Sequence, residues 1–330
     1  SQGRDLTVGW DVSGAQRKAV LDFSVRAEAD SGFAESLRSI SGKASRFREL
    51  FSDDAPLSVS ASWMLNEQER KALVQLLQAS EQETRAGVQS LSGEAGADDA
   101  AAAPGSDAVG QIFGSLKQTV EAGHIDMFAR FVPQESGKFV LIGGMQLADG
   151  KEFGRGLGEL TGLLKDHAKL AALSRNIDSH RGVMFHRLEG KQIRRQDEQV
   201  YGEHPGLYLG TGESTLWFAV GGSDSLAELK LAMDRTVEQP PVTEDQAVAP
   251  FRLAARINRW IQLNPPGVDA RPGQQIAAQA FGAGGDTLLV DIRPTEDGIR
   301  LRVTLGEAFL RMIGLGAGRQ FDRRMEREGL

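Results

Sequence analysis

The chain has 330 residues, of which 40% are hydrophobic and 25% are charged, and its formal net charge is -7. These values are ordinary for a globular protein large enough to hold two domains, and the negative charge argues against a chain-wide nucleic-acid surface. Cysteine is absent, which excludes disulfides, thiol nucleophiles, iron–sulfur clusters and cysteine-bound zinc.

The first half opens with a predicted hairpin. Apolar residues alternate over 6–12 and again over 19–27, as in strands with one buried face. Trp10 shares the parity of Leu6 and Val8, so we expect it in the core. A helix carrying Phe33 and Leu37 should follow.

The next strand has a counterpart two hundred residues later. Residues 54–65 (DAPLSVSASWML) and 248–260 (VAPFRLAARINRW) both begin with Ala-Pro and continue with apolar residues at alternate positions. Proline lacks an N–H and is tolerated at the start of a strand. In the first strand, Leu57 and Val59 should face the core together with Trp63.

Several elements connect these two strands. Asn66 is a good N-cap for a helix through Leu73 and Leu77. Residues 92–106 (SGEAGADDAAAAPGS) are typical of a flexible insert. We then expect a helix over 109–122, a hairpin of 127–133 with 138–147, a helix after Gly150, a strand over 183–188 and a polar loop over 189–203.

The order of elements then restarts. A hairpin of 207–212 with 215–221 precedes a helix around Leu229, the second Ala-Pro strand, a hairpin of 287–294 with 298–305 and a last helix. The repeated order predicts an α+β fold of two tandem related units, with helices packed on one face of antiparallel hairpin sheets. We assign residues 1–200 to the first unit, with the insert at 92–106, and residues 201–330 to the second.

Four segments resemble an uncharacterised family of exported proteins in planctomycete bacteria. They read DAPLSVSASW, GVMFHRL, GLYLGTGESTLWFAVGGSDSLAELKLAMD and DGIRLRVTLGEAFLRMIG. The resemblance covers most of the chain and rests on structural motifs, so it implies no catalytic residues. It implies an extracytoplasmic (periplasmic or secreted) location and further sequence before the first hairpin. The chain begins Ser-Gln-Gly rather than with Met, which is consistent with a processed or truncated product. No export signal is visible.

Candidate sites are few. The one candidate metal site is a cluster of His180, His186 and His204, with Glu203 beside His204. We expect His186 to face solvent. The glycine-rich pieces match neither a dinucleotide-binding nor a phosphate-binding loop, and we expect no cofactor. Asp53-Asp54 and Asp98-Asp99 indicate solvated loops rather than a catalytic pair.

These observations favour a non-enzymatic extracytoplasmic binding or envelope module, with a protein or envelope component as its partner. We expect no nucleic-acid partner and no membrane span, because no apolar run approaches ~20 residues. Two alternatives stay open: a hydrolase whose site lies near His180–His204, and a carrier of a hydrophobic ligand held under a curved sheet.

Overall fold

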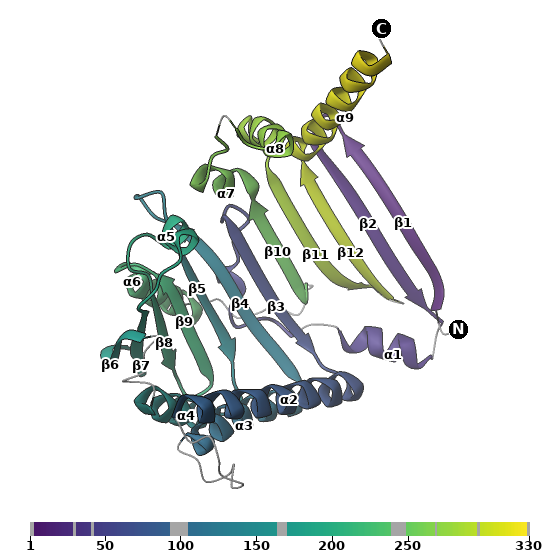
Figure 1. Ribbon diagram of the computed structural model, residues 1–330. Helices are drawn as coiled ribbons and strands as arrows, with labels where there is room; N and C mark the ends of the chain where they lie inside the picture. Colours follow the sequence, from purple (N-terminus) through teal and green to yellow (C-terminus); the bar gives the residue numbers. More distant parts are fainter. Residues whose placement is uncertain are drawn as a thin grey trace. The chain divides into compact units, whose positions relative to one another are not determined.

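The computed structural model describes residues 3–28, 31–40, 43–92, 105–163, 170–238, 249–267, 269–295 and 298–328. The fold is α+β, as predicted, and every strand pair whose register is described is antiparallel (Figure 1). The chain divides into two compact units: Ser1–Arg38, Phe51–Val59 and Ala249–Leu330 form the first, and Ser39–Leu50 and Ser60–Val248 form the second.

The first unit is a sheet with the strand order β1-β2-β12-β11-β10-β3. Strand β3 (Leu57–Met64) is divided between the two units. The unit's other elements are β1 (Gly3–Ser13), β2 (Lys18–Ala27), most of α1 (Gly32–Ser39), β10 (Phe251–Arg256), α7 (Ile257–Leu263), α8 (Pro272–Gly282), β11 (Thr287–Thr295), β12 (Gly298–Gly306) and α9 (Glu307–Glu328).

The second unit has the strand order β3-β4-β5-β9-β8-β7-β6. Its elements besides β3 are the short helix η1 (Arg48–Leu50), α2 (Glu67–Ser92), α3 (Ser106–Glu121), β4 (His124–Pro133), β5 (Phe139–Gln146), α4 (Gly150–Leu163), β6 (Leu170–His180), β7 (Val183–Gly190), α5 (Arg195–Tyr201), β8 (Gly206–Thr211), β9 (Thr215–Gly221) and α6 (Ser225–Val237).

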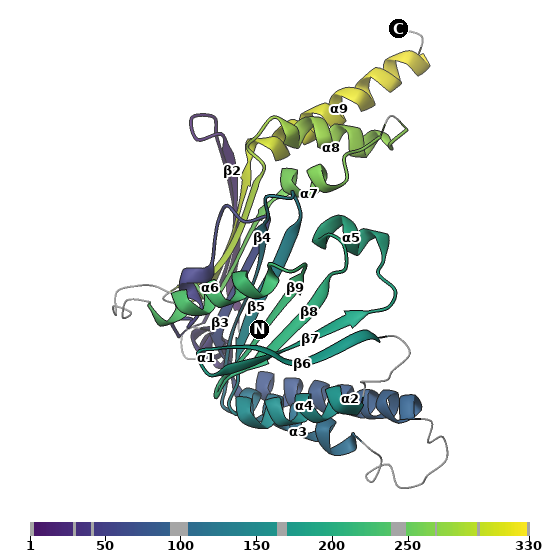
Figure 2. The same cartoon turned by 90° about the vertical axis from the view of Figure 1, so that its left-hand side faces the viewer.

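The main core of the second unit lies under α6, which crosses β5 and β9 (Figure 2). Phe47, Phe128 and Trp217 meet there with ring centroids 5.0 to 6.0 Å apart. Leu229 of α6 is fully buried against the same cluster. Helices α2, α3 and α4 pack side by side at one end of the strands. This unit therefore has helices covering its sheet.

The start of α2 confirms the predicted cap. The backbone N–H of Glu69 donates to Asn66 Oδ1 at 2.9 Å, and the backbone N–H of Asn66 donates to Glu69 Oε2 at 2.9 Å. The pair satisfies two backbone donors that a helix N-terminus would otherwise leave without an acceptor.

The predicted inward face of β3 is confirmed only at Ala61, which is 4% exposed. Leu57, Val59 and Trp63 are only half-buried, whereas Ser58 and Ser62 are almost fully buried. The serine hydroxyls satisfy buried polar groups: Ser58 Oγ accepts from a backbone N–H, and Ser62 Oγ donates to a backbone carbonyl. Alternation identifies side chains that share a face, but here hydrogen bonding allows the polar set to lie inside.

The four predicted hairpins are confirmed as β1/β2, β4/β5, β8/β9 and β11/β12. Five elements were not predicted: η1, β6, α5 within the expected polar loop, α7 and α8. The strand expected over 248–260 is wrong at its end, because β10 stops at Arg256 and α7 begins at Ile257. Strand β6 is irregular: its apolar residues gather at its start, its register shifts between Ser174 and Asp178, and Asn176 has a positive φ of 52°, so the strand lacks clean alternation. Most of the predicted flexible insert at 92–106 lies outside the described residues.

The predicted boundary between residues 200 and 201 falls inside the second unit. Strand β8 follows that boundary but pairs with β7 on one side and β9 on the other, so hydrogen bonds join the two predicted repeats. The internal duplication stays a prediction. Among the described residues, no helix is both long and apolar enough to cross a membrane.

Candidate functional site

The first unit carries an apolar sheet face that spans five strands. Paired residues of neighbouring strands point to the same side, so the strand registers define which side chains share this face. One row across the sheet runs Trp10–Leu21–Val303–Val290–Leu253. The apolar face consists of Leu6, Val8, Trp10 and Val12 (β1), Ala19, Leu21, Phe23 and Val25 (β2), Ile299, Leu301, Val303 and Leu305 (β12), Leu288, Val290, Ile292 and Pro294 (β11), and Phe251, Leu253 and Ala255 (β10).

The part of the chain that the structure describes leaves this face exposed to solvent. Trp10 is 74% exposed, Leu6 68% and Val8 60%, and among the nineteen side chains only Ala19 and Ala255 are buried. The expectation that Trp10 lies in the core is therefore wrong. Trp10 shares a side of β1 with Leu6 and Val8, as predicted, but none of the described residues forms a second layer over that side.

The exposed area is large for a single chain. An exposed aromatic side chain presents up to ~250 Å², so the β1 side chains and Phe23, at their exposed fractions, leave about 500 Å² of apolar surface. That value already lies near the upper end of the largest apolar patch on a typical monomer, about 300–600 Å². The half-buried side chains of β10, β11 and β12 add to it.

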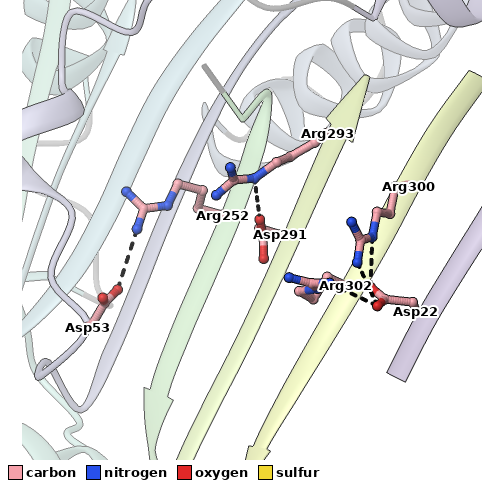
Figure 3. Close-up of polar contacts among 7 residues, drawn as sticks. All are labelled: Asp22, Asp53, Arg252, Asp291, Arg293, Arg300 and Arg302. Atoms are coloured by element: carbon pink, nitrogen blue, oxygen red, sulfur yellow. Dashed lines mark hydrogen bonds and ion pairs between the residues drawn. The ribbon is translucent and has the colours of Figure 1, made fainter. Parts of the chain in front are cut away.

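The opposite side of the same sheet carries charges that form ion pairs (Figure 3). The carboxylate of Asp22 accepts four hydrogen bonds of 2.7 to 2.9 Å from Arg300 and Arg302. Arg293 donates to Asp291 at 2.6 Å, and Arg252 lies 3.5 Å from the Asp53 carboxylate. The sheet is therefore amphipathic, with one side suited to water and the other suited to burial.

The helices at one end of this sheet leave the apolar face open. Figure 1 shows α7, α8 and α9 at the same end of the strands. Helix α9 begins directly after β12, and its Phe309 packs against Phe281 of α8, with ring centroids 4.9 Å apart. Helix α8 thus packs against α7 and α9, and α9 also contacts β12 and β2.

The histidines predicted as metal candidates have separate partners. His180 Nε2 lies 2.7 Å from Asp234 Oδ1, and Arg181 also pairs with that carboxylate. These contacts lower the pKa of Asp234, with Arg181 as the larger cause. Burial lowers the pKa of His186, whose Nδ1 accepts a backbone N–H at 3.3 Å.

His204 lies apart, with a positive φ of 51°, beside a surface depression of about 320 Å³ that is also lined by Glu189, Lys191 and Glu198. Within the described part of the chain, no three His, Asp or Glu side chains converge as metal ligands. The structure therefore does not assemble the predicted histidine cluster.

A second polar cluster was not predicted. Ser62 Oγ lies 3.1 Å from His124 Nε2, and Asp126 stands two residues along the same strand. Burial raises the pKa of Asp126, while burial lowers the pKa of His124. No motif spacing marks this cluster, because Ser62 lies 62 residues before His124 in the sequence.

The residue types resemble a nucleophile, a base and an acid, but their contacts differ from a catalytic triad. Ser62 is 1% exposed and donates its hydroxyl proton to the Lys43 carbonyl at 2.8 Å. Asp126 accepts from Ser45 Oγ and the Arg46 N–H rather than from the imidazole. A nucleophile needs a base that takes its proton and access to substrate, so this cluster is structural.

The adjacent acids at Asp53 and Asp54 are also explained by structure. Asp53 faces Arg252 and Asp54 pairs with Arg256. Both arginines lie on β10. The other adjacent acids, Asp98-Asp99, lie outside the described residues.

The apolar face is therefore the strongest functional candidate that the structure offers. Comparison of the chain with protein-family models, with curated proteins and with solved structures finds no match.

Proposed function

We propose that this protein is a binding or structural module rather than an enzyme, and that its working surface is the apolar face of the β1-β2-β12-β11-β10 sheet. The observation that carries the proposal is the exposure of that face, led by Trp10 at 74%. Large exposed apolar patches on folded chains mark interaction sites. Aromatic residues such as Trp10 and Phe23 are also enriched where binding energy concentrates.

The partner that fits this surface is another polypeptide. The nineteen side chains include no charged group, and β-sheet faces of this kind are buried in proteins by a second apolar layer of sheet or helix. The proposal places the protein outside the cytoplasm, as a periplasmic or secreted envelope component. Support for that location comes from the resemblance to exported proteins, and the absence of cysteine is compatible with it.

Site-specific photo-crosslinking tests this function. A benzophenone amino acid would replace Trp10 on the apolar face, and in a matched control it would replace Asp11, which is exposed on the opposite side of the same strand. We expect polypeptide adducts, identified by mass spectrometry, from position 10 in cells that produce the protein, and few from position 11. Equal adducts from both positions, or none from either, would contradict the proposal.

A carrier of a hydrophobic ligand is the second candidate, because the same apolar face can bind an acyl chain. Native mass spectrometry of the purified protein separates the two functions. A small-molecule adduct that disappears on Val8→Lys substitution would favour the carrier, whereas unliganded protein favours the binding module.

A further inference from the structure

The apolar face needs a partner of matching size and chemistry, and the chain itself offers one. We infer that two copies of this protein pack their apolar faces against each other and form a β-sandwich across a two-fold axis. This inference rests on the proposed function and names the partner as a second copy of the chain. In aligned sandwiches two sheets lie about 10 Å apart, with their strands within about 30° of each other.

The chemistry of the face favours a second copy. A two-fold interface brings the same patch from both subunits together, so the side chains of the patch must be able to pack against the same kinds of side chain. Rows of aliphatic side chains such as Leu21, Val303 and Val290 meet that condition, since they carry no charge or hydrogen-bonding group. The charged side chains of Asp22, Arg300 and Arg302 point away from this interface and keep their ion pairs.

The size of the face is also close to what a stable interface needs. Five strands about 4.8 Å apart, with about seven residues each at about 3.3 Å, give a rectangle of roughly 550 Å². Side-chain relief makes the accessible area larger than this projection. It approaches the roughly 800 Å² per partner of a stable protein interface.

A lipid surface fits less well. Anionic bilayers attract proteins through Lys and Arg near the inserted surface, whereas the apolar face contains no Lys or Arg. Each chain carries a net charge of -7, so two copies repel each other, but salt screens such repulsion and leaves apolar contact intact. Dimerisation through the apolar face should therefore strengthen as the salt concentration rises.

Sedimentation equilibrium of the full chain tests the inference. The chain has a mass of 35.6 kDa, so a dimer has twice that mass, 71.2 kDa. At ~100 µM protein and moderate salt we expect the dimer to predominate. Val8→Lys, at a position 60% exposed in the single chain, should raise the dimer dissociation constant at least about tenfold by placing charges in the apolar interface.

Thr7→Lys is the matched control, because Thr7 is exposed on the opposite side of the same strand and the change in size and charge is similar. It should leave the dissociation constant within about twofold of wild type. Trp10→Ser provides a second interface variant without a charge. Circular dichroism of each variant must match wild type before its mass is interpreted.

A monomeric wild type at ~100 µM, or equal effects of Val8→Lys and Thr7→Lys, would overturn the inference. So would monomeric protein that co-sediments with neutral phosphatidylcholine vesicles and loses that binding on Val8→Lys. If the wild type is monomeric but position 10 still crosslinks to another polypeptide, the second copy is refuted and the proposed function stands. If the wild type is monomeric and position 10 does not crosslink to another polypeptide, both the second copy and the proposed function are refuted.

Discussion

Substitution of Asp126 should reveal how strongly its buried carboxylate stabilises the second unit. Asp126 is 1% exposed and accepts hydrogen bonds from Ser45 Oγ at 2.6 Å and from the Arg46 N–H at 2.7 Å. Ser45 Oγ in turn accepts the backbone N–H of Phe47 at 2.9 Å. These bonds hold the turn that delivers Phe47 and Leu50 to the core.

The expected cost depends on the substitution. Asp126→Ala removes the acceptor of two charge-assisted bonds, each worth about 1.5–3 kcal/mol, and relief of the desolvated carboxylate offsets part of that loss. We expect a decrease of about 3 kcal/mol in the free energy of unfolding. Asp126→Asn can still accept from the Arg46 N–H and donate to Ser45 Oγ, so it should cost only about 1 kcal/mol.

The stability of the wild type and that of Asp126→Asn should also respond differently to pH. Burial raises the pKa of Asp126, so the folded state holds that proton more tightly than the unfolded state does. Lowering the pH through the folded-state pKa therefore adds stability to the wild type, and the gain is complete below the ordinary aspartate value near 3.8. Asp126→Asn lacks this gain, so the stability gap between wild type and Asp126→Asn should widen on acidification.

The nearby His124 does not reverse this sign. Burial lowers its pKa, so folded chains lose stability as the pH falls through the His124 titration, while the negative charge of Asp126 partly opposes that shift. Asp126→Asn removes the negative charge beside His124 and so lowers the His124 pKa further. This change also widens the stability gap between wild type and Asp126→Asn on acidification. Urea unfolding followed by circular dichroism at several pH values measures that gap. A gap that narrows on acidification would contradict the raised pKa of Asp126. Equal costs for Asp126→Ala and Asp126→Asn would contradict the hydrogen bonds that asparagine should keep.

Three further substitutions separate the remaining contributions. Asn66→Ala removes the α2 cap, should cost about 1 kcal/mol in urea unfolding, and would contradict the capping geometry if it were neutral. Trp217→Ala, at a position 4% exposed, should cost about 3–5 kcal/mol, whereas a cost below about 1 kcal/mol would mean that the aromatic cluster is not the core. Asp22→Asn should cost at most about 1 kcal/mol because its arginine partners are partly exposed, and the cost should shrink in high salt; an unchanged cost would argue against an ion-pair origin.

The sequence predicts the hairpins well because alternation is a local property. The shared face of Leu6, Val8 and Trp10 follows directly from their spacing, and the register confirms it. Whether another layer covers that face depends on where the helices pack. The pattern of Phe309 and Ile313 predicts the helix α9 but not that it lies beyond the end of β12.

The polar sites were harder to predict for a related reason. His180, His186 and His204 are close in sequence, yet they do not converge. His180 contacts Asp234, His186 accepts a backbone N–H, and His204 lines a separate surface depression. The buried cluster of Ser62, His124 and Asp126 instead joins distant segments. Sequence proximity is a poor guide to convergence in an antiparallel sheet.

Hydroxyl-radical footprinting of the full chain at low and high protein concentration measures whether a second copy buries the apolar face. We expect Trp10 and Phe23 to be oxidised in dilute protein and to be protected severalfold at ~100 µM. Phe321 of α9, which is 63% exposed, should stay equally reactive and provides the internal control. Unchanged oxidation of Trp10 and Phe23 across this range would contradict the burial of the apolar face by a second copy.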